Sequence, residues 1–539
     1  MNFAMIKRLA LLTLGLVAGS SHAQLATNLF LDTKAMSLGN AVTADPVGIM
    51  SIHFNPAGLT KLDGRQVQFS LQNIYLNVET EFEVPEDYDG ENELLNISDD
   101  PVAGEKGEAS AAVFIPGVGI LPMDALPIMQ APGAGMSIRP EGSRFTFANA
   151  VYIPLAGGFA KSDDDPGRYQ AKKVAMQRLS YLSPSFGYKV NDEFSVGASF
   201  VFSQHVLALE QDLRAPNILI AVAETLQDAF DCFDKDTGEP TGNDPLVPLI
   251  ALCGGDIGPY DDVGTLSIET METLSPSFNT GFLWEPNAWF AWGATYQSEA
   301  RTHLKGTYEL EYTDDFAGFF GKLQSTIFGA IGGAIFQLPS GRKKETGLVS
   351  TEQVFPQRFQ TGIKLKFFED FQFNFDLGWT DFDKWDALTL QFDRPVSFLS
   401  SAKIMAPGLV TDTTLTQPLG FKSVLSPAYG FAYDLNSRVQ LRAGYEPRAS
   451  SIPDDARSIQ APLGFMEMYS VGMGYQWDKD SVVDMAFSFM ESRESIKADP
   501  QSETNNGPYS NSSNALNRNC LTCTVTNPYP GLDVKTKLT

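Results

Sequence analysis

The sequence predicts an all-β fold, a transmembrane antiparallel up-and-down β-barrel of about 14 strands. Three observations predict it: strands in which apolar and polar residues alternate, connections that are alternately short and long, and an N-terminal export signal. The stretch FQFNFDLGW (371–379) shows the alternation, because large apolar residues occupy every odd position and polar residues or glycine every even one. A half-buried strand of a soluble sandwich would alternate in the same way, so the other two observations decide.

Residues 1–23 are expected to be a signal peptide. Lys7 and Arg8 form a short basic region, residues 9–19 an apolar core, and Ser21-His22-Ala23 a small-x-small cleavage pattern. A short membrane anchor is the alternative, but the flanks do not suit one. We therefore expect an exported protein.

No later segment is a convincing transmembrane helix. The nearest, residues 319–338, carries Lys322, Gln324, Ser325 and many glycines. An exported chain that lacks membrane helices and is rich in alternating strands is typical of a bacterial outer-membrane barrel. The expected location is the bacterial outer membrane.

The connections sort by length along the chain. We expect strands at roughly 64–84, 108–118, 143–156, 176–190, 193–212, 264–285, 287–312, 348–368, 370–391, 418–435, 437–449, 464–478 and 480–493. Short turns join some of them and long connections the others, as tight periplasmic turns and long extracellular loops do in a membrane barrel. An even strand number requires one more strand. Residues 531–539 look like its start, and we expect the final strand to be short or the sequence truncated there.

About forty mature residues precede the first strand, at 24–63, and suit a compact segment of small residues. Its NPAGL stretch (55–59) contains a turn signal, because Asn before Pro initiates turns and Pro56 fixes φ. This segment resembles the N-terminal hatch of the FadL/TodX family of outer-membrane transporters for hydrophobic compounds, which carries an Asn-Pro-Ala motif directly before strand one. Residues 182–200, 359–385 and 441–455 also resemble strand pairs and a loop of the family.

The resemblance implies a barrel at 64–539, plugged by a hatch at 24–63 whose motif is Asn55, Pro56, Ala57 and Gly58. It implies passive uptake of long-chain fatty acids or aromatic hydrocarbons. Ligand would be captured in an apolar groove between extracellular loops, pass to a lumenal pocket, and leave through a gap in the wall near strand three. It also suggests a monomer surrounded by outer-membrane lipid and lipopolysaccharide.

Two loop segments carry apolar residues at helical spacing and are candidates for the groove. The alternative is that the two helices pack on each other and cap the barrel. An exposed apolar groove would be unusual on a soluble surface, which makes it informative. The candidate groove residues are Phe316, Phe319, Phe320, Leu323, Ile327 and Ile331 in the later loop and Ile218, Val222 and Leu226 in the earlier one.

A fatty acid carboxylate would need a basic partner in the lumen. Side chains alternate between the two faces of a strand, and the faces rich in Phe and Leu are taken to point outward. On this basis we expect Arg301, Arg358, Lys364 and Arg442 to point inward. The alternative is that they pair with lumenal acids and line the wall. A carboxylate pocket is the reason for favouring a fatty acid over an alkane or a monoaromatic compound.

Gly and Pro inside a strand weaken pairing and mark bulges or gaps. Pro154, Gly157 and Gly158 are therefore the candidates for the lateral opening. An ordinary transition from strand to loop is the alternative. The acidic loop at 161–168 could bind a divalent cation, but a solvated loop is the simpler interpretation.

The composition of the chain argues against some kinds of partner and cofactor. The chain has 65 acidic and 39 basic residues and a formal net charge of -26, which argues against nucleic acid as a partner. Only 4 His residues are present, so we expect neither a metal site nor a cofactor. The four cysteines, Cys232, Cys253, Cys520 and Cys523, suggest two loop disulfides in an oxidising compartment.

Two other functions remain as alternatives. A surface lipase would need a nucleophile with its base, and no G-x-S-x-G motif is present, so we do not expect an enzyme. A general porin would have an open lumen, whereas the N-terminal segment here could fill it. Unchanged ion conductance after deletion of residues 24–60 would favour the porin.

Overall fold

The computed structural model of the chain describes residues 31–86, 96–123, 128–336, 338–403, 409–453, 457, 464–497, 528, 529 and 531–539. Residues 1–23, expected to be the signal peptide, lie outside the described residues, as do Cys520 and Cys523. Within the described ranges, no helix is both long enough and apolar enough to cross a membrane.

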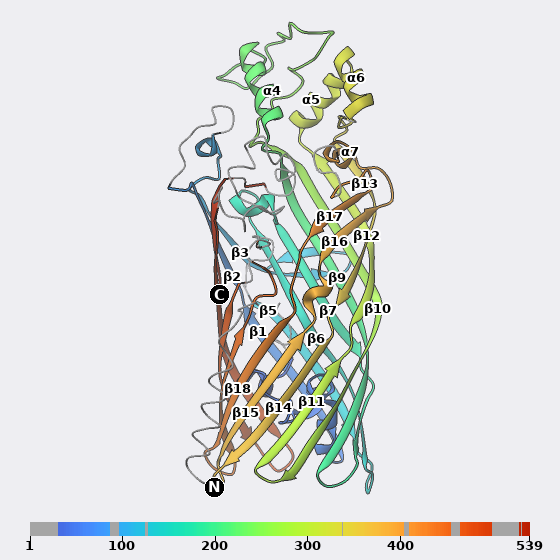
Figure 1. Cartoon of the computed structure of the whole chain (residues 1–539), viewed down its shortest axis with the longest axis vertical. Helices are drawn as coiled ribbons and strands as arrows, with labels where there is room; N and C mark the ends of the chain where they lie inside the picture. Colours follow the sequence, from blue (N-terminus) through green and yellow to red (C-terminus); the bar gives the residue numbers. More distant parts are fainter. Residues whose placement is uncertain are drawn as a thin grey trace.

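The described residues form an antiparallel sheet of 22 strands that closes into a barrel (Figure 1). Several strands follow one another end to end, so the barrel wall has 14 strands, and β22 closes it by pairing with both β2 and β21. The strands are β1 Arg65–Tyr75, β2 Asn77–Glu83, β3 Lys106–Ile115, β4 Gly119–Pro122, β5 Ile128–Ile138, β6 Phe145–Lys161, β7 Lys173–Leu182, β8 Ser185–Lys189, β9 Phe194–Arg214, β10 Asp262–Asn287, β11 Phe290–Gln297, β12 Ala300–Tyr312, β13 Lys344–Phe355, β14 Arg358–Phe367, β15 Phe371–Thr380, β16 Ala387–Phe392, β17 Thr414–Pro418, β18 Val424–Asp434, β19 Val439–Arg448, β20 Met466–Gln476, β21 Val482–Ile496 and β22 Asp533–Leu538.

The described helices are short, and none has more than 12 residues. The α-helices are α2 Thr33–Ser37, α3 Ser51–Phe54, α4 Ile218–Ala229, α5 Asp314–Gln324, α6 Ile327–Phe336 and α7 Ser397–Ala402. The 3-10 helices are η1 Gly48–Met50, η2 Pro56–Lys61, η3 Ile97–Asp99, η4 Pro166–Tyr169 and η5 Phe382–Lys384.

The two faces of β15 show why its residues alternate. The odd-numbered side chains point outward, where Phe373 packs against Phe431 of the neighbouring β18. The even-numbered ones are buried in the lumen, where the Asn374 amide donates to the carbonyl oxygen of Ala41 at 2.8 Å. A strand between lipid and a polar, plugged lumen therefore has large apolar residues on one face and hydrogen-bonding residues on the other.

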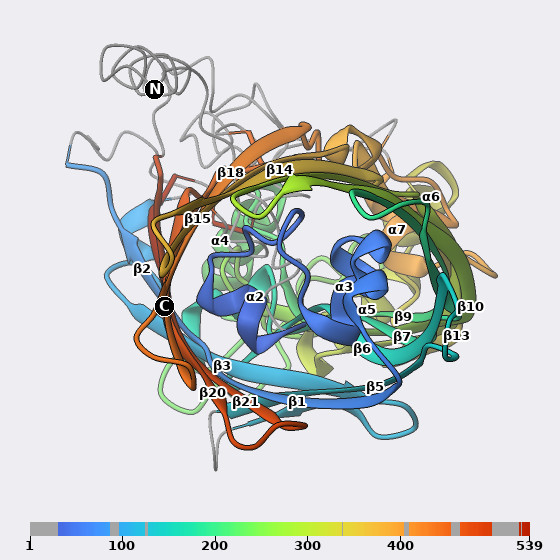
Figure 2. The same ribbon diagram turned by 90° about the horizontal axis from the view of Figure 1, so that it is seen from below.

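Residues 31–62, which we call the hatch segment, fold inside the barrel. Seen from below, α2 and α3 lie within the ring of strands (Figure 2). A single apolar core joins the segment to the wall. Its residues are Leu31, Ala35, Leu38, Val42, Val47, Ile49, Met50, Ile52, Phe54, Leu59 and Leu62 from the segment and Ala148, Ala150, Tyr152 and Ala432 from the wall.

The expected strand list missed β5 and the four-residue β4. The Gly- and Pro-containing residues of β5 were interpreted as a connection, but they pair in unbroken register with β1, from Arg65 opposite Ile138 to Tyr75 opposite Ile128. Small residues are present because the hatch segment packs on them: a Cβ at Gly135 would lie 2.6 Å from Cγ2 of Ile49. Close packing, rather than a turn, explains these glycines.

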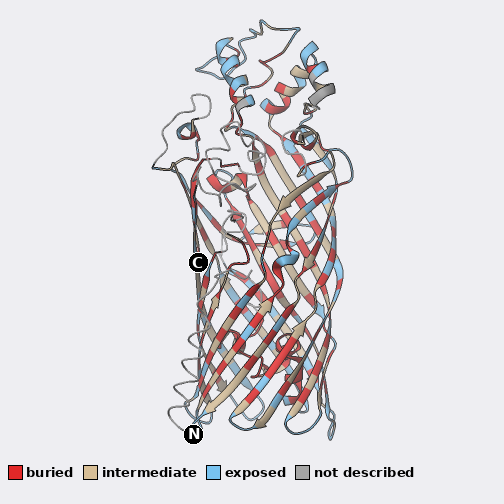
Figure 3. Cartoon of the chain, viewed as in Figure 1, coloured by how far each residue is buried: buried red, intermediate tan, exposed pale blue. Residues whose placement is uncertain are grey.

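The extracellular end carries the long loops. α4, α5 and α6 stand above the barrel, and their surfaces include many exposed positions (Figure 3). A second apolar core joins these loops to the upper strands, with Tyr308 and Leu310 of β12 and Phe316 of α5 among its buried residues. The apolar face of the upper strands therefore points inward.

Candidate substrate path and hatch

Asn55 fixes the hatch segment to the wall. Its side-chain oxygen caps η2 by accepting from the amide of Ala57 at 3.2 Å. Its Nδ2 donates to the carbonyl oxygens of Thr43 at 2.8 Å and of Phe282, in β10, at 2.9 Å. Pro56 occupies the first helical position, where a missing N–H costs nothing. The Asn-Pro-Ala motif is thus a cap that also joins the segment to the wall.

The wall meets the hatch segment through glycines that face the lumen. A Cβ at Gly197 would lie 2.3 Å from the backbone carbon of Pro56, and one at Gly444 would lie 2.0 Å from the amide nitrogen of Gly39. We call these lumen-facing glycines the glycine seat. They let the backbone of the hatch segment lie directly against the backbone of the strands on several sides. The members of the glycine seat are Gly187, Gly197, Gly281, Gly293, Gly430, Gly444 and Gly472.

A polar anchor holds the other side of the segment. Asp45 accepts from the amide of Gln372 at 2.9 Å and lies 3.3 Å from the Lys34 ammonium and 3.8 Å from that of Lys364. Burial alone would raise the pKa of Asp45, but Lys34, Lys364 and the amide donors outweigh it and hold the pKa well below its usual range. Asp45 is therefore ionised throughout the pH range of a living cell.

Asp32 caps α2, and its pKa is raised rather than lowered. Its oxygens accept from the amide of Ala35 at 2.9 Å and from Gln68 at 2.7 Å. Burial and the nearby Asp484 raise the pKa of Asp32, and the hydrogen bonds from Ala35 and Gln68 offset this only partly. The resulting pKa is about 6.

We expect Asp32→Asn to remove a pH dependence from the stability of the hatch segment. An unfolded Asp titrates near a pKa of about 4. Because the folded pKa is higher, the folded state binds the proton more tightly, so stability is greatest below about pH 4, falls as pH rises to about 6, and is then constant. The fall should be roughly 2–3 kcal/mol. Urea unfolding of the detergent-solubilised protein between pH 4 and 8 measures it, and an equal pH slope in both proteins would contradict the assignment.

Two of the buried arginines, Arg178 and Arg358, lie near the hatch segment. Arg178 of β7 donates to the hydroxyls of Ser203 at 3.2 Å and Ser277 at 2.9 Å, and its guanidinium lies 6.0 Å from the ring of Phe355. Arg358 of β14 is 8% exposed, and its Nε has no hydrogen-bond partner among the described residues. Buried guanidinium groups normally bind a carboxylate, so these two donors can receive one.

His53 of the hatch segment lies close to both arginines. Burial, followed by Arg358 and Arg178, holds the pKa of His53 well below its usual range, so its ring is neutral. His53, Tyr152, Pro154 and Arg178 line a small cavity of about 20 Å³, room for about one water molecule. The arginines are therefore the positive charge of this region.

The four residues expected to bind a carboxylate have different environments. Arg358 is inward and buried. Arg442 is also buried but is engaged by Asp484 at 2.6 Å and Gln440 at 2.7 Å. Lys364 lies 3.8 Å from both Asp45 and Glu285 and belongs to the polar anchor.

The inward orientation expected for Arg301 is wrong. Its side chain is 75% exposed and pairs with Glu299 at 2.8 Å. The buried face of β12 is the opposite one, where Ala300 packs with Leu155 of β6 across the lumen. On β12 the exposed face carries charged residues such as His303 and Lys305 and the apolar residues are buried, so counting from an outward apolar face fails there.

The candidate groove residues divide into buried and exposed sets. Phe316 and Phe319 are buried, and Phe320 and Leu323 are partly buried against the core that joins the two loops. The side chain of Ile218 is outside the described part of the structure. The exposed apolar residues are Leu219, Val222 and Leu226 on α4 and Ile327, Phe328 and Ile331 on α6. The loops thus pack together and still present apolar side chains to solvent.

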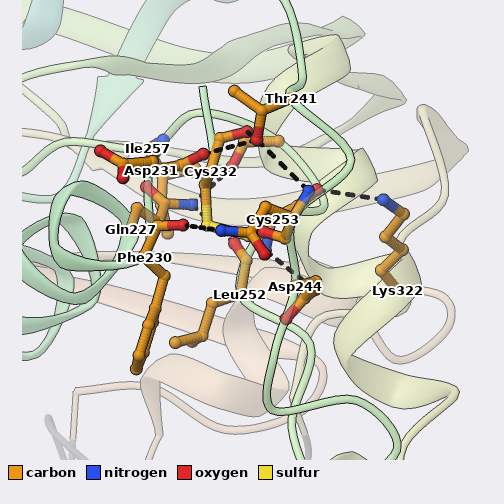
Figure 4. The surroundings of a disulfide bond; sticks show 12 residues. Gln227, Phe230, Asp231, Cys232, Thr241, Asp244, Leu252, Cys253, Ile257 and Lys322 are labelled. Atoms are coloured by element: carbon orange, nitrogen blue, oxygen red, sulfur yellow. Dashed lines mark hydrogen bonds between the residues drawn. A yellow bond between two sulfur atoms is a disulfide. The ribbon is translucent and has the colours of Figure 1, made fainter. Parts of the chain in front are cut away.

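A disulfide between Cys232 and Cys253 ties the loop after α4 (Figure 4). Gln227 of α4 donates to the carbonyl oxygens of Leu252 at 2.7 Å and Gly255 at 2.8 Å, and Lys322 of α5 donates to that of Cys253 at 3.0 Å. The bridge therefore lies where the two loops meet, and it stabilises their packing.

The wall is interrupted beside β6. Pairing with β5 ends at Val151 opposite Ala134, and pairing with β3 begins only at Phe159 opposite Ala111. The register with β7 shifts between Tyr152 and Leu155, a bulge that contains Pro154. A Cβ at Gly157 would have no atom within 4 Å, so this position faces open space. Pro154, Gly157 and Gly158 all lie in the interruption.

Sequence reasoning missed Arg178 and the glycine seat. Arg178 had no clear signal, because the face of β7 opposite it carries Lys173 and Gln177 as well as Leu179 and Tyr181. The glycines had none, because a glycine on a polar face looks the same whether backbone or water lies against it. Among the described residues, no group of three or more His, Cys, Asp or Glu side chains could hold a metal ion.

The closed barrel, the lumenal N-terminal segment and the wall interruption define a class, the outer-membrane transport barrels. Residues 16–526 match the family model of the outer membrane protein transport proteins (OMPP1/FadL/TodX). The chain belongs to this family, whose members transport hydrophobic compounds across the outer membrane and are channels rather than enzymes.

Solved structures show the same fold at low sequence identity. A FadL homologue of Pseudomonas aeruginosa is 17% identical with a TM-score of 0.60, covering 96% of this chain and 98% of that one. The toluene transporter TbuX of Ralstonia pickettii is 15% identical with a TM-score of 0.53, covering 95% and 97%. The toluene transporter TodX of Pseudomonas putida is 12% identical with a TM-score of 0.53, covering 96% and 97%. No curated protein sequence matches the chain.

Proposed function

We propose that this protein takes up long-chain fatty acids through the outer membrane by passive diffusion. The observation that supports a fatty acid is the pair Arg178 and Arg358, two buried guanidinium groups on the lumenal face of the wall, of which the Arg358 Nε has no hydrogen-bond partner among the described residues. A carboxylate would supply charge-assisted hydrogen bonds to both. An uncharged hydrocarbon would leave them as they are.

The path has three parts in this proposal. Exposed apolar residues of α4 and α6 collect the acyl chain, which then lies in the lumen against Phe355 and Trp385. Residues 24–63 act as the hatch, and the ligand leaves through the interruption at Pro154, Gly157 and Gly158. The protein acts as a monomer, with lipid and lipopolysaccharide around its outer face.

Uptake of a monoaromatic hydrocarbon is the second candidate. The names of TbuX and TodX as toluene transporters, and the aromatic lumenal cluster of Phe355, Phe382 and Trp385, favour it. Both candidates use the same apolar path, and only the charged head group separates them.

We expect Arg178→Met and Arg358→Met each to weaken oleate binding about 10- to 100-fold, since a hydrogen bond to a charged group contributes about 1.5–3 kcal/mol. Binding of octadecane, which has no head group, should change less than about threefold. Titration of the purified protein in detergent measures both ligands. Arg301→Met is the matched control, because this arginine is exposed on the outside of β12. Equal losses for oleate and octadecane would contradict the carboxylate assignment and favour the hydrocarbon.

A further inference from the structure

Two segments of the extracellular loops form one apolar surface. The backbone amide of Ile327, at the start of α6, donates to the carbonyl oxygen of Pro248 at 3.1 Å. The amide of Phe328 donates to that of Leu249 at 2.9 Å. The loop after α4 therefore lies directly beside α6, at the end of the molecule opposite the hatch segment (Figure 1). We call this surface the loop tip, and its members, each more than half exposed, are Val247, Leu249, Ile327, Phe328 and Ile331.

The loops already have an apolar core beneath the loop tip. Leu246 and Ile250, which flank the exposed residues of the same segment, pack inward on a cluster that contains the buried Phe319 of α5. Thr326 caps α6, because its hydroxyl accepts from the amide of Gly329 at 3.1 Å. The loop tip is therefore held by ordered structure, and its side chains are a surplus that this core does not cover.

α6 offers no polar contact to a partner. Its sequence, IFGAIGGAIF, contains only Ile, Phe, Gly and Ala, so no side chain in it carries a charge or makes a hydrogen bond. A helix that is apolar on every side is normally enclosed by a protein core or by lipid. Ile327, Phe328 and Ile331 instead face solvent. Their partner therefore lies outside the molecule and is apolar.

The size of the loop tip argues against a protein as that partner. A stable protein interface buries about 800 Å² on each side, and its strongest contacts come mostly from Trp, Tyr and Arg. The loop tip consists of aliphatic and phenyl side chains from two short segments and has none of those three residue types. Contact with oil needs no hydrogen-bond complementarity, because the gain follows from the apolar area removed from water.

The charge around the loop tip indicates which kind of apolar phase it can meet. Residues 218–261 and 314–343, the two loops that carry it, contain 11 acidic and 4 basic residues. Asp234, Asp236 and Glu239, in the same loop as Val247, are exposed. An anionic surface, such as a membrane of acidic phospholipid or a fatty acid micelle, would be repelled. An uncharged oil surface would not.

We propose that the loop tip docks on uncharged oil, at the surface of a droplet in which the hydrophobic substrate is dissolved. On docking, Phe328 and its neighbours leave water and enter the oil, which brings the extracellular loops next to the substrate. The substrate then passes from the oil to the loops without crossing water, in which it is poorly soluble. This inference rests on the proposed function and deepens it, because it names the physical form in which the substrate is taken up.

Flotation measures docking without any transport. The purified protein in lipid nanodiscs should float with sonicated triolein droplets. The triple variant Ile327→Gln, Phe328→Gln, Ile331→Gln should lower the bound fraction at least about tenfold, because three apolar side chains no longer leave water. Leu348→Gln is the matched control and should float like the wild type, since this leucine is 59% exposed on β13, outside the loop tip. A triple variant that floats like the wild type would overturn the proposal.

Two comparisons separate oil from other partners. Val247→Ser combined with Leu249→Ser changes the other segment of the loop tip and should cause a similar loss, even if the α6 variant does not form its helix. Sonicated vesicles of phosphatidylglycerol, an anionic lipid, should bind at least about tenfold less protein than triolein does. Equal binding to both would contradict the proposal in favour of a membrane. Nanodiscs that pair without oil, and separate in the variants, would contradict it in favour of a second copy of the chain.

Uptake shows whether docking serves transport. Cells displaying the protein receive labelled oleate either dissolved in triolein droplets or bound to albumin. Val247→Ser combined with Leu249→Ser should slow uptake from the droplets about tenfold and leave uptake from albumin within about twofold of the wild type. An equal change for both sources, or no change for either, would refute the proposal. If the wild type takes up oleate from neither source, the proposed function fails, while flotation still decides whether the loop tip docks on oil.

Discussion

Gly197→Val is expected to expel the hatch segment and convert a blocked barrel into one that conducts ions. Position 197 faces Pro56, and even a Cβ there would lie 2.3 Å from the Pro56 carbonyl carbon. Neither backbone can move away easily, because Gly197 belongs to the sheet and Pro56 to the capped η2 helix. Overpacking typically costs about 1–3 kcal/mol, and here the cost falls on the contact that seats the segment. Conductance of single barrels in planar bilayers measures the outcome.

The effect should depend on position rather than on glycine replacement as such. Gly444→Val should act like Gly197→Val, since its Cβ would lie 2.0 Å from the amide of Gly39 on the other side of the segment. Gly333→Ala is the control, because a Cβ there has no atom within 4 Å. If Gly197→Val stays closed to ions while folding normally, the glycine seat does not hold the hatch.

Arg214→Met should destabilise the extracellular rim by about 3–5 kcal/mol, the cost of removing one partner of a buried ion pair. Arg214 donates to both oxygens of Asp100 at 2.7 and 2.8 Å and to the carbonyl oxygen of Pro528 at 2.7 Å. Its guanidinium also lies 4.5 Å from the ring of Tyr169 and 5.0 Å from that of Tyr529. One side chain thus joins β9 to three extracellular segments.

Limited proteolysis of the loops and the urea midpoint measure this loss. Asp100→Asn should be nearly as damaging, because it leaves Arg214 buried with only neutral acceptors. The double variant Arg214→Met, Asp100→Leu should recover much of the stability, since it removes both charges. A double variant as unstable as the sum of the two single changes would show that the pair is not the reason for the loss.

Local pattern was enough to predict the barrel. Alternation in stretches such as residues 371–379 follows from lipid on one side and a filled lumen on the other. The Asn55-Pro56 turn before the first strand is likewise a local signal, and the plug itself was implied by the resemblance of that segment to the family's hatch. Both features are properties of neighbouring residues, so a sequence displays them directly.

The features that the sequence did not predict depend on residues that are distant in the chain. Arg301 was placed on the wrong face, because on β12 the apolar residues, Tyr308 and Leu310 among them, are the buried ones and the charged residues are exposed. β5 was missed because its glycines serve close packing against Ile49, which lies far away in sequence. That the Nε of Arg358 lacks a hydrogen-bond partner among the described residues could not be predicted either, since it depends on which side chains surround it.

Uptake of labelled oleate and labelled toluene by cells that lack their own transporter is the most direct test of the central claim. Cells displaying this protein should take up oleate saturably, lose that uptake when Asn55 and Pro56 are replaced, and lose most of it with Arg358→Met. Uptake of toluene alone, unaffected by Arg358→Met, would contradict the fatty acid assignment and make the protein a hydrocarbon channel.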